Sequence, residues 1–389
     1  MSGTGLLQGV RVLDLASVGP AARASRWLAD YGAGVIKVGP VPRHSGVQIS
    51  PPFHAYSGHR LMKRVLLDLK SEDGRGAFLR LAGSADVVIE SFRPGVADRL
   101  GVGYRDVCNV KPDVVYCSTS GYGRTGPRSR WAGHDINYLA VGGFLACSQP
   151  RADGGPPIPG ATIADIAGGG MQAVMSICAA LFRREVSGEG ALLDVSVADG
   201  VAAMLSLYID EYLVTGEAPG PGHDILTGRY ACYDLYECRD GRWISVGAIE
   251  PAFYANLCRA LGLDKWVDHQ SDDAVQDQIR DDFRATFLTR DRDDWVAELA
   301  PADTCVAPVN SIPELVEDEQ FGSRALIVEA EHARHGRFRQ VGAVLAGQSG
   351  SEVPFRVRDV DETDTEELLS EAGFSGDEIT GLKEQGVVA

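Results

Sequence analysis

Two segments of this 389-residue chain carry residues that could move protons. His134 and Asp135 stand together in RWAGHDINY, a stretch that reads as a loop. Asp165 stands at the start of a glycine-rich apolar segment, ADIAGGG. An imidazole and a carboxylic acid can act as base and acid on the two faces of one carbon atom. Taken singly, however, an isolated histidine is usually structural, and a carboxylate at a helix start is usually an N-cap.

Other motifs that suggest a cofactor are weaker. GYGRTG at 121–126 has the glycine spacing of a dinucleotide-binding loop, but Pro127 follows and no apolar helix begins there. A tight glycine-rich turn is therefore favoured. His332 and His335 lie among arginines, a poor environment for a metal cation, so a solvated surface is expected. The sequence thus predicts no metal site and no redox cofactor.

Short apolar strands alternate with helical stretches in the first third of the chain, which is typical of a parallel α/β sheet. The expected strands are 10–16, 34–38, 65–69, 86–90 and 113–120. A long, nearly uncharged helix is expected over 161–186, buried on all sides, with its glycines allowing close packing. A second apolar helix is expected over 194–214.

The second half of the chain carries different signals. Asp240-Gly241 joins two strands, 233–238 and 243–249, which predicts a hairpin. Thr363–Glu366 and Ser375–Glu378 fit capping boxes of C-terminal helices. The predicted fold is α/β. A large, Rossmann-like parallel-sheet domain spans 1–215, a smaller α+β domain spans 216–320, and the C-terminal segment 321–389 returns to the large domain.

The composition limits the partners. The net charge of −17 opposes binding to nucleic acid or to an anionic membrane. The 8 cysteines form no C-x-x-C pair, so we expect free thiols in a reducing cytoplasm. The chain begins without a signal segment, and no stretch approaches the ~20 apolar residues that span a bilayer. We therefore expect a cytoplasmic protein with no nucleic-acid and no membrane partner.

Basic residues in the first third of the chain fall at predicted strand ends or in loops. They are Arg43, Lys63, Arg64, Lys70, Arg93, Arg99, Arg124, Arg128 and Arg130. In a doubly wound sheet, ligands bind beyond the carboxyl ends of the strands, so such a positive rim would suit a phosphate-rich ligand. Positive residues that merely balance an acidic surface explain the pattern equally well.

The sequence as a whole resembles the family III CoA-transferases and, within them, the α-methylacyl-CoA racemases. The likeness runs from about residue 8 to the end. It is strongest in LDLKSEDG (67–74), ESFRPGVADRLGVG (90–103), SGYGRTGPRSRWAGHDINYLA (120–140), ADIAGGG (164–170) and YECRDGRWISVGAIEP (236–251).

The resemblance implies a role for each matching residue. His134 and Asp165 would be the two acid/base residues, and Glu250 would support His134. An apolar setting would have to raise the pKa of Asp165 to keep it protonated. Contacts to the CoA part are implied for Arg43, Leu67, Asp68, Leu69, Lys70, Ser91, Phe92, Arg93, Pro94, Gly95, Arg99, Gly133, Asp135, Ile136, Asn137 and Tyr138. No cofactor is implied, because CoA enters as part of the thioester substrate.

The resemblance also implies an interlocked homodimer, with the site between one chain's large domain and the other chain's small domain. Three functions stay open: a racemase of 2-methylacyl-CoA thioesters, a CoA-transferase with Asp165 as nucleophile, and a non-catalytic CoA-binding relative. The last is motivated by departures from the family pattern. Gly39 and Pro40 replace the usual residues after the second strand, and Leu61 and Met62 interrupt a basic motif.

Overall fold

The computed structural model describes residues 5–16, 18–42, 52–343, 354–359 and 362–389. The chain divides into two compact units. The large unit comprises residues 1–143, 159–206 and 319–389, and the small unit comprises 144–158 and 207–318. The domain boundary predicted at 216 therefore lies at Leu207. The small unit also takes in 144–158, where Gln149 Nε2 donates a hydrogen bond to the Thr227 carbonyl at 3.2 Å.

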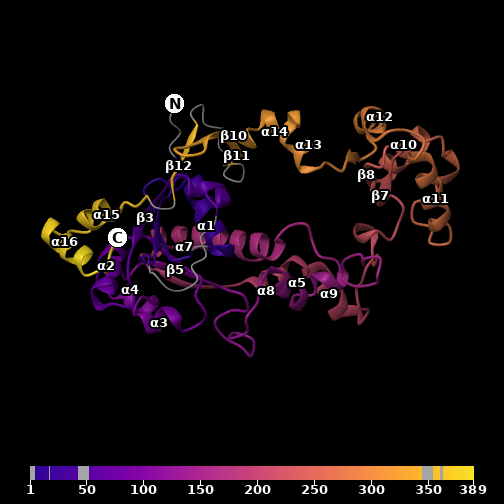
Figure 1. The fold of residues 1–389 in the computed structure, drawn as a ribbon. Coiled ribbons are helices and arrows are strands. Elements are labelled where there is room, and N and C mark those ends of the chain that lie inside the picture. Colours follow the sequence, from indigo (N-terminus) through magenta and orange to yellow (C-terminus); the bar gives the residue numbers. More distant parts are fainter. Residues whose placement is uncertain (1–4, 17, 43–51, 344–353, 360–361) are drawn as a thin grey trace. The chain divides into compact units, whose positions relative to one another are not determined.

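The large unit is built on a six-stranded parallel sheet (Figure 1). The strand order is β3-β2-β1-β4-β5-β6, a doubly wound arrangement, which confirms the predicted fold class. The strands are β1 (Arg11–Asp14), β2 (Gly34–Gly39), β3 (Met62–Leu66), β4 (Val87–Glu90), β5 (Val115–Ser120) and β6 (Ala191–Ser196). The helix predicted over 194–214 was wrong at its start, because Asp194–Ser196 pair with β5.

Helices cover both faces of this sheet. On one face, α1 (Gly19–Asp30) and α7 (Gln172–Ser187) bury Leu28 and Ile177 against it. On the other face, Phe78 and Leu368 lie in the core formed with helices α2 (Glu72–Ala82), α3 (Val96–Leu100), α4 (Tyr104–Cys108), α15 (Thr365–Glu371) and α16 (Gly376–Glu384). The C-terminal helices thus pack on the large unit.

The capping boxes predicted for these last helices differ in outcome. The Ser375 hydroxyl accepts the Glu378 backbone N–H, and the Glu378 carboxylate accepts the Ser375 N–H, as predicted. The box at Thr363–Glu366 was wrong. Asp364 is the N-cap of α15, and its carboxylate accepts the Arg64 backbone N–H instead of capping the helix.

The glycine-rich segment Ala164–Met171 forms a π-helical turn that runs into α7. Its glycines permit close packing, as predicted. A Cβ atom on Gly168 would lie 2.8 Å from the Val197 carbonyl oxygen of α8 (Val197–Met204), and one on Gly169 would lie 2.5 Å from Pro20 of α1. Two neighbouring helices therefore fix this turn in place.

Burial of this helix on all sides was wrong. Met175 and Phe182 of α7 are 69% and 74% exposed, because only the face toward the sheet and α1 is covered. By length and composition alone, Ala164–Ser187 would also be long and apolar enough to cross a membrane, although no such stretch was expected. Core helices of soluble proteins pass the same test, and α7 packs on the sheet as such a helix does.

The carboxyl ends of the parallel strands bring distant segments to one edge of the sheet. β1 leads into α1, β3 into 67–70, β4 into 91–95, and β5 into the loop that ends at His134. The strand order reverses between β1 and β4, and ligands of doubly wound proteins bind at this point of reversal. The candidate residues of the large unit therefore gather where a ligand is expected.

The small unit holds an antiparallel sheet of three strands, β7 (Tyr233–Glu237), β8 (Trp243–Gly247) and β9 (Val306–Pro308). The predicted hairpin is confirmed, and Gly241 takes the left-handed conformation of its turn with φ +73°. Strand β9 was not predicted. The helices of this unit are α6 (Phe144–Cys147), α9 (Ser206–Thr215), α10 (Pro251–Ala260), α11 (Gln276–Phe287), α12 (Arg292–Leu299) and α13 (Ile312–Glu317).

A further sheet follows α14 (Glu319–Ser323) and belongs to the large unit. It consists of β10 (Ile327–His332), β11 (Gly336–Val341) and β12 (Phe355–Val357). The solvated surface expected for His332 was wrong. Its ring is almost fully buried, and Nδ1 accepts a hydrogen bond from the Arg334 backbone N–H at 3.1 Å.

Candidate active site

His134 is the N-cap residue of α5 (Asp135–Val141). Its extended backbone, with φ −129° and ψ 176°, ends the loop that leaves β5, and its side chain is exposed. The His134 N–H donates to Asn137 Oδ1 at 3.0 Å. This contact fixes the start of the helix and leaves the imidazole at the surface of the large unit.

Tyr138 packs against this loop and hydrogen-bonds to its backbone. Its hydroxyl donates to the Gly133 carbonyl at 2.6 Å. Its ring also fills the space that side chains at Gly121 and Gly133 would occupy, since Cβ atoms there would lie 2.3 and 2.8 Å from it. Burial, helped by the nearby charge of Asp165, raises the pKa of Tyr138 to about 12. Tyr138 therefore acts as a neutral hydrogen-bond donor that positions the residue before His134.

Asp165 lies in the π-helical turn, and a direct contact joins it to the His134 loop. Its backbone N–H donates to Asp135 Oδ1 at 2.8 Å, across 30 residues of sequence. The charges of His134 and Asp135 both act on the Asp165 carboxyl group. The structure thus brings His134, Asp135 and Asp165 together, although no spacing in the sequence joins them.

The ionisation of Asp165 reflects opposing influences. Burial is the largest and raises the pKa of its carboxyl group. Arg23 on α1 lowers it, Asp135 raises it and His134 lowers it, and the net pKa lies above the usual value of an aspartic acid. The sequence prediction required a setting of this kind. A carboxyl group with a raised pKa keeps its proton to a higher pH than an ordinary aspartic acid does.

Arg23 is the site residue that sequence reasoning missed. Its Nη1 lies 3.5 Å from Asp165 Oδ2, and its Nη2 donates to Thr162 Oγ1 at 2.7 Å. A single arginine near the start of an alanine-rich helix was the one signal available, and such a residue is usually solvated.

Glu250 belongs to the small unit. It is the N-cap residue of α10, but its side chain makes no capping hydrogen bond. The carboxylate is exposed on the surface of that unit. Its support of His134 stays a prediction.

The residues implied in CoA contacts fall into accessible and inaccessible groups. Lys70, Arg93 and Arg99 are exposed in segments that follow the carboxyl ends of β3 and β4, where their cations would suit phosphate groups. Ser91, Ile136 and Asn137 are exposed as well, whereas Asp68, Leu69, Phe92, Pro94, Gly95, Gly133, Asp135 and Tyr138 are half-buried. Arg43 lies outside the described residues.

Among the described residues of this set, Leu67 alone has a buried side chain. It is only 1% exposed and forms a backbone bridge with Val388, so its side chain belongs to the core.

The segment 91–95 is held by a residue that the sequence did not single out. Buried Glu90 accepts the Phe92 N–H at 2.6 Å and also binds the Ser118 hydroxyl. Burial raises the pKa of Glu90, and its hydrogen bonds oppose that shift.

The described residues include no group of three or more histidine, cysteine, aspartate or glutamate side chains arranged to hold a metal ion. The glycine-rich loop at 121–126 is followed by turns rather than a helix, as predicted, with Gly123 and Gly126 at φ +81° and +85°. The fold and the site together define a doubly wound α/β protein. A histidine and a carboxyl group with a raised pKa lie near the carboxyl-end edge of its parallel sheet.

Comparison with known proteins identifies the family. The model of CoA-transferase family III matches residues 7–359. Alpha-methylacyl-CoA racemase of Mus musculus is 32% identical over 395 residues, which cover 98% of this chain and 97% of the relative. Succinyl-CoA:glutarate CoA-transferase of Mus musculus is 29% identical over 352 residues, covering 87% of this chain and 80% of the relative.

Among solved structures, a CAIB/BAIF family protein from Brucella suis superposes with a TM-score of 0.72 at 25% identity. It covers 94% of this chain and 98% of its own. The chain therefore belongs to the CoA-transferase family III, a family of enzymes with both racemase and transferase relatives at modest identity.

Proposed function

We propose that the protein is a racemase that interconverts (2R)- and (2S)-2-methylacyl-CoA thioesters through an enolate. One observation supports the proposal: the Asp165 N–H donates a hydrogen bond to Asp135, the residue after His134, and the pKa of Asp165 is raised. The racemase relative, similar over 98% of this chain, supports the same function.

The proposed reaction moves one proton off a carbon atom and another onto it. In one direction, neutral His134 takes the α-proton and the thioester becomes an enolate. Protonated Asp165 then gives its proton to the opposite face, which leaves an imidazolium and a carboxylate. In the reverse direction the two residues exchange roles. CoA is part of the substrate, and Lys70, Arg93 and Arg99 would bind its phosphates.

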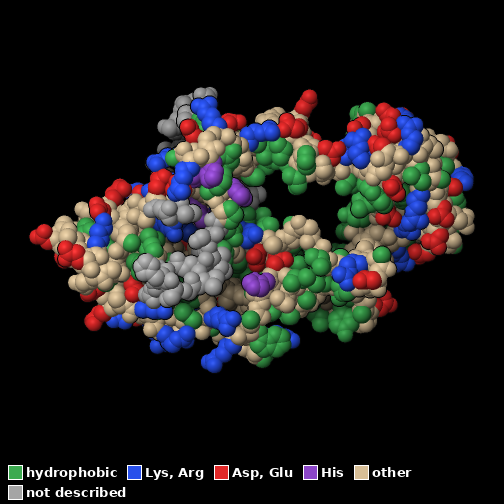
Figure 2. Space-filling model, viewed as in Figure 1, with side chains coloured by type: hydrophobic (Ala, Val, Ile, Leu, Met, Phe, Trp, Pro, Cys, Tyr) green, Lys and Arg blue, Asp and Glu red, His purple; other side chains and the backbone are tan. Residues whose placement is uncertain are grey.

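The proposal includes a homodimer in which Glu250 of one chain supports His134 of the other. Exposed apolar side chains support an association of this kind. Phe182 of α7 is 74% exposed in the large unit, and Leu213 and Val214 of α9 are 72% and 86% exposed in the small unit. Figure 2 shows hydrophobic side chains gathered where α9 lies. Apolar side chains that are exposed on the surface of a unit are typical of protein interfaces.

A CoA-transferase is the second candidate, and the contact between Arg23 and Asp165 favours it. A cation 3.5 Å from Asp165 Oδ2 stabilises the carboxylate, the form that acts as a nucleophile. That carboxylate would attack the thioester carbonyl, expel CoA thiolate and form a mixed anhydride. The thiolate would then attack the Asp165 carbonyl, releasing the free acid and leaving an enzyme-bound CoA thioester. Transferase relatives at 29% identity are consistent with this chemistry.

Deuterium exchange separates the two candidates. In deuterated water, a racemase incorporates deuterium at the α-carbon of a 2-methylacyl-CoA, detected by mass spectrometry, and inverts its configuration. The His134→Gln variant should lose inversion by about 10²–10⁴-fold, while Asp165 still exchanges the α-hydrogen of one epimer. Loss of exchange from both epimers alike would contradict the assignment of the two residues to opposite faces.

The transferase gives a different result. It incorporates no deuterium but transfers CoA to a free carboxylic acid, and hydroxylamine traps Asp165 as a hydroxamate. The matched control is His269→Gln, a half-exposed histidine of the small unit that pairs with Asp272. Its rates should equal those of the wild type. Absence of exchange on a panel of 2-methylacyl-CoA esters would refute the racemase.

A further inference from the structure

Arg23 approaches Asp165 through a contact that the glycine-rich turn makes possible. Gly170 lies against α1, where a Cβ atom would be 3.2 Å from Arg23 Cβ and 2.9 Å from the Trp27 ring. Any larger residue at Gly170 would push the helix away. The turn that carries Asp165 therefore packs closely on α1, and this close packing lets Arg23 reach the Asp165 carboxylate.

The guanidinium is held on several sides. Its Nη2 donates to Thr162 Oγ1 at 2.7 Å, three residues before Asp165. Its Cζ lies 5.4 Å from the centre of the Tyr56 ring, and the Tyr56 hydroxyl accepts the Gly19 N–H at 2.9 Å, at the start of α1. Arg23 therefore bridges α1 and the segment that leads into the Asp165 turn, and it has little freedom to leave.

The contact with the carboxylate is electrostatic rather than a close hydrogen bond. Arg23 Nη1 and Asp165 Oδ2 are 3.5 Å apart, and the two side chains are 20% and 17% exposed. This Nη1 atom is buried, with no hydrogen-bond partner in the described part of the chain. A cation at this distance stabilises a carboxylate without fixing it in the ionised state.

We propose that Arg23 is a positioning residue that orients the Asp165 carboxyl group and sets the pH at which Asp165 becomes a base. The inference deepens the proposed function and rests on it. When Asp165 takes the α-proton, it must first be ionised, and Arg23 favours that form. When Asp165 gives a proton, burial and the Asp135 carboxylate favour the protonated form. Among the described residues, the charged and titratable groups that act on Asp165 are Arg23 on α1, His134 at the N-cap of α5, and Asp135 and Tyr138 on α5.

Two substitutions separate charge from geometry. In Arg23→Gln the cation is lost. In the reaction direction in which Asp165 is the base, the acid limb of the pH–rate profile should therefore move to higher pH by about one unit. In Arg23→Lys the positive charge remains. A single ammonium group, however, cannot bind Thr162 and face Asp165 at the same time, as the forked guanidinium does. The acid limb should then stay near its wild-type pH while kcat falls about tenfold. The control is Arg11→Gln, which removes a more exposed ion pair with Glu371.

A second readout does not depend on the reaction. Labelling of Asp165 by a water-soluble carbodiimide, followed by peptide mass spectrometry, reports the carboxyl group over a range of pH. The labelling profile should move to higher pH in Arg23→Gln and stay in place in Arg23→Lys. Thermal melts confirm that each variant is folded. If Arg23→Gln does not fold, Thr162→Val tests positioning alone and should lower kcat without moving either profile.

The two proposals fail in different ways. An unmoved acid limb and an unmoved labelling profile in folded Arg23→Gln would overturn the role of Arg23, whatever the reaction. If Arg23→Gln does not fold and only Thr162→Val can be measured, an unchanged kcat in Thr162→Val would overturn the role of Arg23. A shifted labelling profile in a protein that exchanges no α-hydrogen would refute the racemase and leave Arg23 as the residue that sets the ionisation of Asp165.

Discussion

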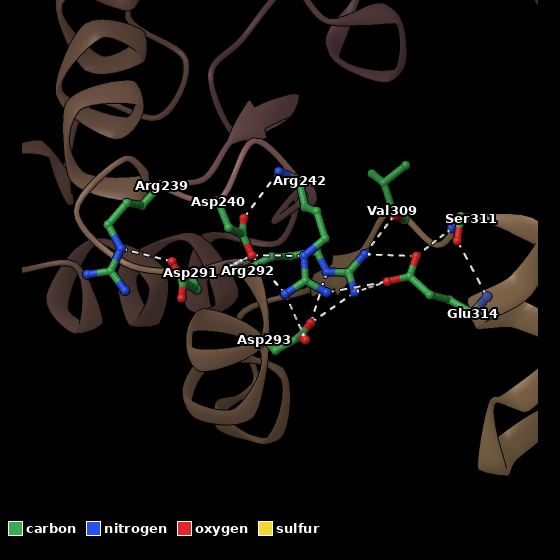
Figure 3. A network of polar contacts seen from close by, with 9 residues as sticks. All are labelled: Arg239, Asp240, Arg242, Asp291, Arg292, Asp293, Val309, Ser311 and Glu314. Carbon is green, nitrogen blue, oxygen red and sulfur yellow. Dashed lines mark hydrogen bonds and ion pairs between the residues drawn. The ribbon is translucent and has the colours of Figure 1, made fainter.

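An arginine lies beside a carboxylate in two regions of this molecule, and the pKa of the carboxyl group shifts in opposite directions in the two. In the small unit, Glu314 accepts a hydrogen bond from Arg292 Nη2 at 2.6 Å and another from the Ser311 N–H at 2.7 Å (Figure 3). Arg292 also donates to the Val309 carbonyl at 3.0 Å. The hydrogen bonds from Arg292 and Ser311 hold the pKa of Glu314 well below its usual range. This carboxylate is fixed in one charge state.

At the sheet edge of the large unit, an arginine again lies near a carboxylate, but there the pKa of the carboxyl group is raised. In the part of the chain that the structure describes, one arginine lies near Asp165, at 3.5 Å, and the Asp165 N–H is engaged by another carboxylate, Asp135. Burial outweighs the cation, so the pKa is raised. Several short donors make a carboxylate structural, whereas burial with one distant cation leaves it able to titrate. That difference distinguishes a site of chemistry from a site of stability.

The largest expected effect comes from removing the titrating group. Asp165→Asn should lower α-hydrogen exchange and inversion by about 10²–10⁴-fold, because an amide neither takes nor gives the proton. The matched control is Asp277→Asn, a fully exposed aspartate of the small unit, which should react at the wild-type rate. Equal loss in the control, or none in Asp165→Asn, would contradict the assignment.

The same variant should also change the pH dependence of stability. A carboxyl group whose pKa is raised in the folded chain disfavours folding once it ionises. Its cost therefore appears as pH rises above the usual value of an aspartic acid and is complete above the folded-state pKa. Thermal melts should show Asp165→Asn gaining stability relative to the wild type from acidic to neutral pH. A relative loss over that range would contradict the raised pKa.

An intermediate effect is expected in the other region. Arg292→Met removes the donors of Glu314 and Val309 and should destabilise the small unit by about 1–3 kcal/mol, measured by thermal or urea unfolding. Well below the melting temperature, the exchange rate should stay within about twofold of the wild type. The control is Arg239→Gln, an exposed pair with Asp291, for which no measurable change is expected. A lower rate with unchanged stability would make this network part of the site.

Much of the fold follows from local patterns in the sequence. The five predicted strands of the large sheet, its parallel class and the hairpin at Asp240-Gly241 rest on apolar runs and on turn residues, which act over a few positions. Strand β6 was missed in part because Asp194–Ser196 join the sheet only through their pairing with β5. His332 was placed at the surface because its burial depends on a hairpin that no local signal announced.

The site was predictable only in part for the same reason. His134 and Asp165 each had an ordinary structural explanation, and the resemblance to a family, rather than any spacing, suggested that they act together. The contact that joins them is made by the Asp165 backbone N–H, which every residue but proline carries. The role of Arg23 depends on the approach of α1 at Gly170, a tertiary feature.

The smallest expected effect separates the charge of Asp135 from its hydrogen bond. Asp135→Asn keeps an oxygen that can accept the Asp165 N–H but removes the negative charge that raises the pKa of Asp165. The carbodiimide-labelling profile of Asp165 should therefore move to lower pH by roughly half a unit, opposite to its movement in Arg23→Gln. Asp135→Ala, which loses the hydrogen bond as well, should in addition react more slowly. If Asp135→Asn and Arg23→Gln moved the profile in the same direction, neither charge would control Asp165, and the contrast with Glu314 would have to rest on burial alone.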